Sequence, residues 1–335
     1  MTVKVAINGF GRIGRLALRS IVELRRDDIE VVAINDLGPV ATLAHLLKYD
    51  SVHGPFQGSI ATGEDWIDIG SGKIKVFSER DPSKLPHNEL GVDVALECTG
   101  FFTSREKAES HIRAGAKRVL VSAPSDGADK TIVFKVNHDT LTADDVVVSN
   151  GSCTTNVLAP VAKVLNDLCG IERGYMTTVH AYTGDQPTQD TVHKDLYRAR
   201  AAALSMIPTS TGAANAIGRV LPELKGKLHG SSIRVPTPNV SVIDLAVSTS
   251  REVSIDEVND AIRQTAAGAM SGVLAFTTEP LVSVDLNHRT ESSIVALPQT
   301  DVVDGRMVRV LAWYDNEWSF ATRMADTAVA MAKLI

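Results

Sequence analysis

The residues most able to do chemistry lie in the stretch Ser149–Asn156, which reads SNGSCTTN and contains Cys153. It joins an apolar segment expected as a strand, Val146–Ser149, to a segment expected as a helix, Thr154–Leu168. A thiol at a helix start lies near free backbone N–H groups and the positive end of the helix dipole, which favours the thiolate. The stretch therefore predicts a nucleophilic cysteine or, as the plainer alternative, a small buried residue at a helix start.

A thiol in this position still needs a partner. A free cysteine is only a few per cent thiolate at pH 7. Making the thiolate the main form takes roughly 2 kcal/mol, of which a helix end supplies about 0.3–1 kcal/mol. His180 is the candidate base. Strand alternation places it on one face with Thr178 and Tyr182. A histidine on such a polar face is usually a surface residue, but together with Cys153 it predicts an activated nucleophile.

A glycine-rich turn near the start of the chain indicates a dinucleotide site. The turn GFGRIG follows an apolar strand, Val3–Asn8, and opens a helical pattern. An acid, Asp36, ends the next apolar strand, Ile29–Asn35. Glycines at such a turn let the backbone approach a pyrophosphate, and a carboxylate in this place binds ribose hydroxyls and repels a 2′-phosphate. The pattern favours NAD over NADP, with three expected turn glycines: Gly9, Gly11 and Gly14.

The two halves of the chain predict different sheets. The first half alternates strands and helices, as in a Rossmann-type α/β domain with a parallel sheet. Its further expected elements are a helix over 13–24, a helix over Val40–Tyr49, hairpins over Gly58–Phe77, strands over Val92–Glu97, Arg118–Ser122 and Thr131–Val136, and a helix over Ser104–Ala114.

The second half has longer, alternating strands, which indicates an α+β domain with a mostly antiparallel sheet. The expected strands are Tyr175–Tyr182, Ser231–Ser250 (interrupted by Pro236 and Pro238), Ser292–Leu297 and Met307–Tyr314. The expected helices are Gly212–Val220, Ser254–Ala269 and Glu317–Ile335. A long irregular segment, Thr183–Ser210, is expected to be functional because structureless loops of that length usually are.

Composition excludes several classes of protein. The chain has 335 residues, of which 44% are hydrophobic and 22% charged, and its net charge of −6 gives no hint of a nucleic-acid or membrane surface. No apolar run is long enough to span a membrane, and a strand pattern from Val3 leaves no room for a signal peptide. Three scattered cysteines favour a reducing cytoplasm over a disulfide scaffold, and no motif predicts a metal or ATP site.

Hydroxyls and arginines in the second half predict anion binding. Ser152 and Thr154 flank the thiol, and Thr209–Gly212 places hydroxyls and free N–H groups before a helix. Arg234 lies on a strand between apolar residues, and Arg198 lies in the long loop. Each arginine alone is more typical of a solvated surface charge, but the hydroxyl-rich helix start favours a phosphate-bearing substrate.

These motifs resemble the phosphorylating glyceraldehyde-3-phosphate dehydrogenase family over essentially the whole chain. The matching segments are INGFGRIGR, AINDL, HLLKYDSVHG, LVSAP, SNGSCTTN, TTVHAYTGDQ, HKDLYRARAAALSMIPTSTGAA, IRVPTPNVSV and WYDNEWSF. The resemblance implies that Cys153 is the nucleophile and His180 its activator. Glyceraldehyde 3-phosphate would be oxidised with NAD through a thiohemiacetal and a thioester, which inorganic phosphate would convert to 1,3-bisphosphoglycerate.

The same resemblance implies further sites and an assembly. NAD contacts would be Arg12, Ile13, Asp36, Arg80, Ser122 and Asn316, and two anion subsites would use Ser152, Thr154, Thr183, Arg198, Thr211, Gly212 and Arg234. Residues 1–152 and 317–335 would form the NAD-binding domain and residues 153–316 the catalytic domain. The protein would be a cytoplasmic homotetramer of glycolysis or a related pathway, with the long loop at a neighbour's NAD pocket.

Some positions depart from the family's common pattern. Gly151 replaces an alanine, Val157 a second cysteine and Ser319 a glycine, and Thr191-Val192 replaces a Leu-Pro pair frequent in strictly NAD-dependent members. We therefore expect a strong but not absolute preference for NAD.

Three other functions remain as alternatives. They are an erythrose-4-phosphate dehydrogenase, which hydrolyses its thioester, a cysteine hydrolase, and a non-catalytic NAD-binding protein. The hydroxyl-rich segment before the Gly212 helix argues against the first, the dinucleotide motif against the second, and the paired Cys153 and His180 against the third.

Overall fold

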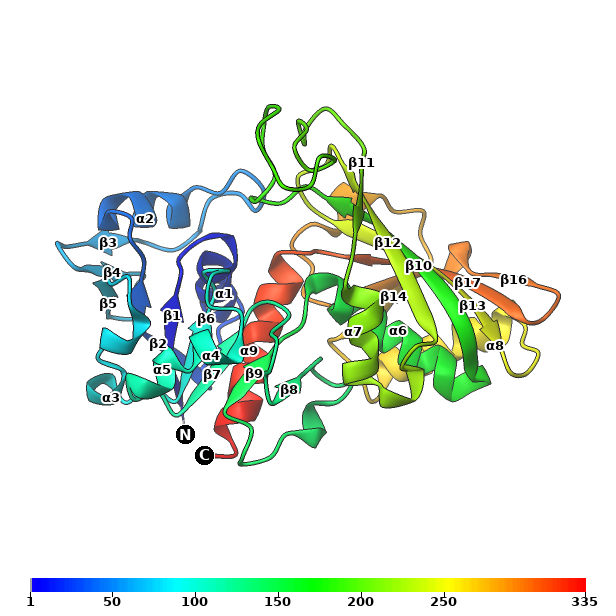
Figure 1. Cartoon of the computed structure of the whole chain (residues 1–335), viewed down its shortest axis with the longest axis horizontal. Coiled ribbons are helices and arrows are strands. Elements are labelled where there is room, and N and C mark those ends of the chain that lie inside the picture. Colours follow the sequence, from blue (N-terminus) through cyan, green and yellow to red (C-terminus); the bar gives the residue numbers. More distant parts are fainter. Residues whose placement is uncertain (1) are drawn as a thin grey trace. The chain divides into compact units, whose positions relative to one another are not determined.

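A computed structural model describes residues 2–335, which divide into two compact units, each with its own sheet (Figure 1). The first unit holds the chain up to Ile132, together with His138–Gly151 and Ala321–Ile335. The second holds Val133–Asn137 and Ser152–Phe320. Among the described residues, no helix combines the length and apolar character needed to cross a membrane.

The sheet of the first unit has nine strands in the order β3-β4-β5-β2-β1-β6-β7-β9-β8. All pairs from β5 to β8 along this order are parallel, and β3, β4 and β5 form antiparallel hairpins. The strands are β1 (Val3–Asn8), β2 (Ile29–Asn35), β3 (Ala61–Thr62), β4 (Trp66–Asp68), β5 (Lys73–Phe77), β6 (Val94–Glu97), β7 (Arg118–Val121), β8 (Lys130–Thr131) and β9 (Val147–Ser149).

Helices of the first unit bury apolar stripes of their sequence. In α1 (Arg12–Glu23), Leu16, Ala17 and Ile21 are buried at the spacing of one helix face. The other helices are α2 (Val40–Lys48), α3 (His87–Leu90), α4 (Arg105–Ala108), α5 (Ser110–Arg113) and the part of α9 (Trp318–Ala332) from Ala321 onward. The single helix expected over Ser104–Ala114 is thus wrong in detail, because the segment forms two short helices that meet at Glu109.

The strand expected over Thr131–Val136 is also wrong. It ends at Thr131, after which Lys135 adopts a φ of 61° and Asn137 Oδ1 accepts the backbone N–H of Val133 at 2.8 Å. A side chain that satisfies the backbone in this way stabilises a turn in place of a sheet ladder. The apolar run therefore leaves the sheet, and Val133–Asn137 belongs to the second unit.

The sheet of the second unit has eight strands in the order β11-β12-β10-β13-β17-β15-β14, with β16 paired to β17. Five of its strand pairs are antiparallel, whereas β10–β12 and β14–β15 are parallel. The strands are β10 (Ile171–Ala181), β11 (Ile207–Ser210), β12 (Leu228–Val235), β13 (Ser241–Thr249), β14 (Leu274–Thr277), β15 (Ser293–Ala296), β16 (Asp301–Val303) and β17 (Met307–Tyr314). The predicted combination of a mostly parallel first sheet and a mostly antiparallel second sheet is confirmed.

One long strand was expected over Ser231–Ser250, and the structure has two. Strands β12 and β13 lie on opposite sides of β10, so the chain must leave the sheet between them. The prolines Pro236 and Pro238 fall in this connection, where their missing N–H groups cost no ladder hydrogen bond.

Three helices cover one face of the second sheet (Figure 1). They are α6 (Cys153–Cys169), α7 (Ala213–Val220) and α8 (Ile255–Ala267), and they share a continuous apolar core with β10, β13, β15 and β17. Helix α6 begins at Cys153 because Ser152 caps it, its Oγ accepting the backbone N–H of Thr155 at 3.1 Å. This cap places the thiol in the first turn of the helix.

Candidate active site

The thiol of Cys153 and the imidazole of His180 face each other in the second unit. Sγ of Cys153 lies 3.4 Å from Nε2 of His180, between the start of α6 and the end of β10. The other ring nitrogen, Nδ1, lies 2.6 Å from the carbonyl oxygen of Ala181. Because a carbonyl can only accept, Nδ1 carries the proton and Nε2 presents a lone pair to the thiol. His180 can therefore take the proton of Cys153.

Strand alternation correctly placed His180 with Thr178, but the plain expectation of a surface position is wrong. His180 is only 3% exposed, and Thr178 on the same face is fully buried. The polar face of this strand end is turned into the protein. A buried histidine must have hydrogen-bond partners, and Cys153 and Ala181 supply them.

Burial opposes charge on both members of the pair. It lowers the pKa of His180 to about 3, with the positive charge of Arg234 adding to the effect. Burial also raises the pKa of Cys153, although Arg234 and hydrogen bonds from Thr154 act in the opposite direction. Either group alone is thus held neutral. Transfer of the proton from Sγ to Nε2 creates two opposite charges within 3.4 Å, and their mutual attraction offsets the cost of burial.

Tyr314, a residue that its sequence context did not single out, contacts both elements that carry this pair. Its hydroxyl lies 2.9 Å from Oγ1 of Thr154 on α6 and 2.9 Å from Oγ1 of Thr178 on β10. Its ring meets His180 edge-on, with centroids 5.8 Å apart. Burial raises the pKa of Tyr314, so the hydroxyl stays protonated. One feature of the sequence could have indicated Tyr314: it ends an apolar strand and directly precedes two polar residues, Asp315 and Asn316.

Arg234 lies beside His180 because β12 runs parallel to β10 and places Arg234 opposite His180. Its Nη1 donates to the carbonyl of Ala181 at 3.0 Å and to Oγ1 of Thr183 at 2.9 Å. Burial lowers the pKa of Arg234, and its Nε is buried without a partner among the described residues. A partly buried cation with an unused, buried donor is a fitting site for an anion.

Asp185 links the remaining predicted anion contacts, and it too was missed. It forms an ion pair with Arg198 and accepts the hydroxyl of Thr183. Burial opposes its ionisation, but the Thr183 hydroxyl and the Arg198 and Arg234 charges hold the pKa of Asp185 below its usual range. Thr183, Arg198 and Arg234 are therefore brought together around one carboxylate. The signal in the sequence was an acid two residues after Thr183 within the functional loop.

The other predicted anion contacts lie at helix starts. Thr211 accepts the backbone N–H of Ala213 at 3.2 Å, and Gly212 directly precedes α7. Ser152 is the cap of α6, and its Oγ also lies 2.9 Å from Oγ1 of Thr155. These positions offer hydroxyls beside the free N–H groups of a helix start, as the sequence indicated.

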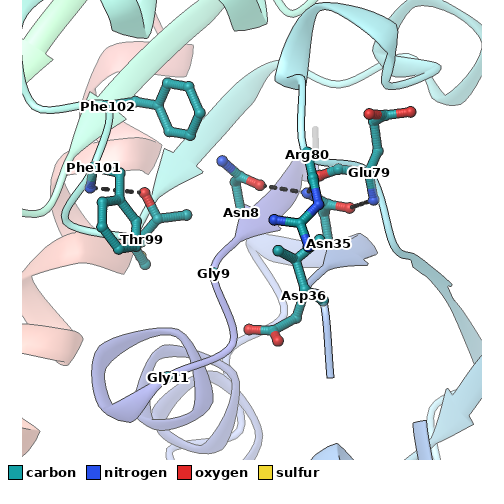
Figure 2. Close-up of a pocket in the computed structure, with 12 residues that line it drawn as sticks. Asn8, Gly9, Gly11, Asn35, Asp36, Glu79, Arg80, Thr99, Phe101 and Phe102 are labelled. Atoms are coloured by element: carbon teal, nitrogen blue, oxygen red, sulfur yellow. Dashed lines mark hydrogen bonds between the residues drawn. The ribbon is translucent and has the colours of Figure 1, made fainter. Parts of the chain in front are cut away.

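The glycine turn of the first unit borders a pocket of about 450 Å³ (Figure 2). Gly9 has a φ of 88°, and a Cβ there would lie 2.7 Å from the backbone nitrogen of Thr99. A Cβ on Gly14 would lie 2.1 Å from the carbonyl oxygen of Gly9, whereas one on Gly11 would meet no atom within 4 Å. Gly9 and Gly14 are thus required by packing, and Gly11 leaves the backbone open to the pocket. This cradle fits a pyrophosphate.

Asp36 and Arg80 line the same pocket. The Asp36 carboxylate points toward the turn at Gly11 (Figure 2), accepting the N–H groups of Phe10 at 2.7 Å and Gly38 at 2.9 Å. Each carboxylate oxygen keeps a further lone pair, so Asp36 retains the acceptor capacity that the expected contact with ribose hydroxyls needs. The pocket is also lined by residues that the sequence analysis missed: Asn8, Asn35, Leu37, Glu79, Cys98, Thr99, Phe101 and Phe102.

These further residues lie at or just after the carboxyl ends of neighbouring parallel strands. Ligands of open α/β sheets bind at that edge of the sheet, so the positions of the strand ends could have indicated these residues. Of the other predicted NAD contacts, Arg12 forms an ion pair with Asp50 at 2.5 Å and Ile13 lies in the first turn of α1. Ser122 donates its backbone N–H to the carbonyl of Glu97 at 2.9 Å. Asn316 lies in the second unit, where its Oδ1 accepts the hydroxyl of Ser241 at 2.7 Å.

Comparisons with known proteins match one family profile to part of the first compact unit and another to most of the second. A family profile described as glyceraldehyde 3-phosphate dehydrogenase, NAD binding domain, matches residues 3–105, and one described as its C-terminal domain matches residues 152–316. The chain is 67% identical to proteins named glyceraldehyde-3-phosphate dehydrogenase from Cereibacter sphaeroides and Xanthobacter flavus, covering 100% of each chain. It is 54% identical to the protein of that name from Geobacillus stearothermophilus, covering 99% of each chain.

Proposed function

The chain belongs to the glyceraldehyde-3-phosphate dehydrogenase family, and from this premise we propose that Cys153 and His180 oxidise glyceraldehyde 3-phosphate and pass the acyl group to inorganic phosphate. The activity is NAD-dependent, as the family's NAD-binding domain indicates. The observation that carries the catalytic assignment is the 3.4 Å contact between Sγ and Nε2, with the opposite ring nitrogen fixed by Ala181.

The first step forms the bond between Cys153 and the substrate. Nε2 of His180 accepts the thiol proton while Sγ attacks the aldehyde carbon, and Nε2 then passes that proton to the resulting oxyanion, which becomes the hydroxyl of a thiohemiacetal and leaves His180 neutral again. The backbone N–H of Cys153, in the first turn of α6, and the imidazolium of His180 stabilise the developing oxyanion.

The oxidation step requires His180 a second time. NAD, when bound at the glycine turn and Asp36, supplies the acceptor for the hydride that leaves the thiohemiacetal carbon. Nε2 of His180 removes the hydroxyl proton, which leaves a thioester on Cys153. Inorganic phosphate then attacks the thioester carbon, the C–S bond breaks, and the thiolate of Cys153 is regenerated with 1,3-bisphosphoglycerate as the product.

The anion contacts hold the two phosphate groups. Arg234, Thr183 and Arg198 offer buried or partly buried donors beside the catalytic pair, and Thr211 and Gly212 offer a helix start. We assign Ser152 and Thr154 to the same subsites because they flank the thiol. One subsite binds the substrate phosphate and the other the attacking phosphate.

We extend the proposal to domains and assembly: residues 1–152 and 317–335 form the NAD-binding domain, residues 153–316 form the catalytic domain, and the protein acts in the cytoplasm as a homotetramer. The two compact units differ from these bounds only in that Val133–Asn137, Ser152 and residues 317–320 belong to the second unit. The long loop supports self-association, because Val192, Leu196, Leu204 and Met206 are each at least 75% exposed. Sedimentation equilibrium tests the assembly, and a monomer at micromolar concentration would contradict it.

The catalytic proposal is tested by NADH formation from glyceraldehyde 3-phosphate and NAD, with and without inorganic phosphate. Sustained turnover only with phosphate is the expected result. Turnover that does not need phosphate would mean that water resolves the thioester, as in an erythrose-4-phosphate dehydrogenase. Binding of NAD without turnover in either condition would favour a non-catalytic protein.

A further inference from the structure

We propose that Glu97 is a positioning residue for the dinucleotide pocket, because its buried carboxylate holds the residues on both sides of the glycine turn. The inference rests on the proposed function only in taking NAD as the occupant of the pocket. It concerns residues of the first unit alone.

Glu97 ends β6 and is 1% exposed. Its Oε2 accepts the amide of Asn8 at 2.6 Å and lies 3.1 Å from Nε2 of His111. Its Oε1 accepts the backbone N–H of Thr99 at 2.8 Å and the Thr99 hydroxyl. Four groups that can donate therefore converge on two oxygens, so Glu97 acts as an acceptor at both. A carboxylate satisfied in this way fixes the positions of its donors.

Two of these donors belong to residues that shape the glycine turn. Asn8 directly precedes Gly9, and Thr99 lies against it, since a Cβ on Gly9 would lie 2.7 Å from the Thr99 nitrogen. Asn8, Gly9 and Thr99 all line the pocket. A shift of the Glu97 carboxylate would consequently move the backbone on both sides of the turn that approaches the pyrophosphate.

Asn8 is held from the other side as well. Its Oδ1 accepts the amide of Asn35 at 2.7 Å, and Oδ1 of Asn35 accepts the backbone N–H of Glu79 at 2.8 Å (Figure 2). Hydrogen bonds thus run across the ends of β2, β1 and β6 beneath the pocket. With Asn35 donating to Oδ1, the Asn8 amide must direct its Nδ2 toward Glu97.

A histidine pair supports Glu97 on the side away from the turn. Nδ1 of His111 lies 3.0 Å from Nε2 of His87, and Nδ1 of His87 has no hydrogen-bond partner among the described residues. If Nε2 of His111 donates to Glu97, then Nδ1 of His111 accepts a hydrogen bond from Nε2 of His87. The unpartnered Nδ1 of His87 is in that case an acceptor rather than a buried donor. Burial lowers the pKa of His87 to about 4, so His87 is neutral at pH 7. His87 belongs to the same hydrogen-bonded chain but does not line the dinucleotide pocket.

The test compares Glu97→Gln with matched variants by calorimetric titration of NAD and of ADP-ribose, which lacks nicotinamide. Gln keeps the shape of the side chain but points an NH₂ group at donors. We expect both dissociation constants to rise roughly tenfold or more, the scale of a lost hydrogen bond to a charged group. Alkylation of Cys153 by iodoacetamide in the protein without NAD, and kcat at saturating NAD, should stay within about twofold. Glu106→Gln, an exposed carboxylate on α4, should change neither affinity.

Two further variants separate positioning from stability. His87→Phe should lower the melting temperature but leave both affinities within about twofold. Thr99→Val removes one donor and should weaken binding, whereas Thr99→Ser should retain it. If Glu97→Gln does not fold, Thr99→Val decides in its place.

The proposal is overturned if Glu97→Gln lowers the melting temperature while both affinities stay unchanged. It is also overturned if His87→Phe weakens binding as much as Glu97→Gln does, because the role would then be structural. A wild-type protein that binds NAD but forms no NADH would overturn the proposed function alone, since the affinities can still be compared.

Discussion

The pocket of the first unit and the catalytic pair of the second are built in different ways. The pocket is made by glycines and by the ends of parallel strands, and hydrogen bonds hold its polar side chains Asp36 and Asn8, the latter through the buried Glu97 behind the pocket. The Cys153–His180 pair joins a helix start to a strand end, with the charge of Arg234 beside it. We propose that one region accepts a ligand through its backbone shape and that the other moves a proton between two side chains.

This difference predicts that chemistry and dinucleotide binding can be lost separately. Cys153→Ser should lower kcat by roughly 10³-fold or more, because the hydroxyl is a far weaker nucleophile, yet leave the dissociation constant of NAD nearly unchanged. Steady-state kinetics and calorimetric titration measure the two effects. Cys169→Ser is the matched control: Cys169 is a buried thiol at the end of α6, hydrogen-bonded to the carbonyl of Leu165, and its replacement should leave kcat near the wild-type value.

The next largest effect is expected at Arg234. Arg234→Lys keeps the charge but cannot donate to both Ala181 and Thr183 in the same geometry, so kcat/KM for phosphate should fall roughly 10- to 100-fold. Arg309→Lys, an exchange at an ion pair with Asp244 on the same sheet, provides the control. Equal effects of the two exchanges on kcat/KM would show that Arg234 has no special role at the anion site.

A smaller change is expected when the acid of the dinucleotide pocket is neutralised. Asp36→Asn should weaken NAD binding roughly tenfold and bring NADP closer to NAD in catalytic efficiency, because the repulsion of a 2′-phosphate is removed. The wild-type protein itself should prefer NAD strongly but not absolutely. Comparable kcat/KM values for the two cofactors in the wild type would contradict the role of Asp36.

The smallest effect concerns stability in acid. Burial opposes ionisation of Asp50, but Arg12 and the N–H groups of Val52 and His53 lower its pKa to about 2. A depressed pKa stabilises the folded state above the ordinary pKa near 4, and this contribution is lost as the pH falls toward 2. The stability gap between wild type and Asp50→Asn in urea unfolding should therefore be constant above pH 5 and narrow below pH 4. A gap that stays constant to pH 3 would show that the Arg12 pair does not stabilise the fold.

The same comparison explains what the sequence could predict. The glycine turn and Asp36 were found because their residues lie in a short βαβ segment with fixed spacing. Cys153 and His180 could be named as candidates from their residue types, but the burial of His180 depends on packing between α6 and β10, which the sequence does not show. Asp185 and Tyr314 were missed because their partners are far apart in the chain or in an irregular loop. The Thr131–Val136 strand was wrong because apolar character alone does not reveal a side chain that turns the backbone.

We propose that Cys153 and His180 act as one proton-sharing unit. The most direct test is the rate of Cys153 alkylation by iodoacetamide from pH 5 to pH 10 in the wild type and in His180→Asn. The wild type should react readily at pH 7, whereas the variant should lose this neutral reactivity and react only at alkaline pH, because burial raises the pKa of the isolated thiol. Superimposable profiles of the two proteins would contradict the claim.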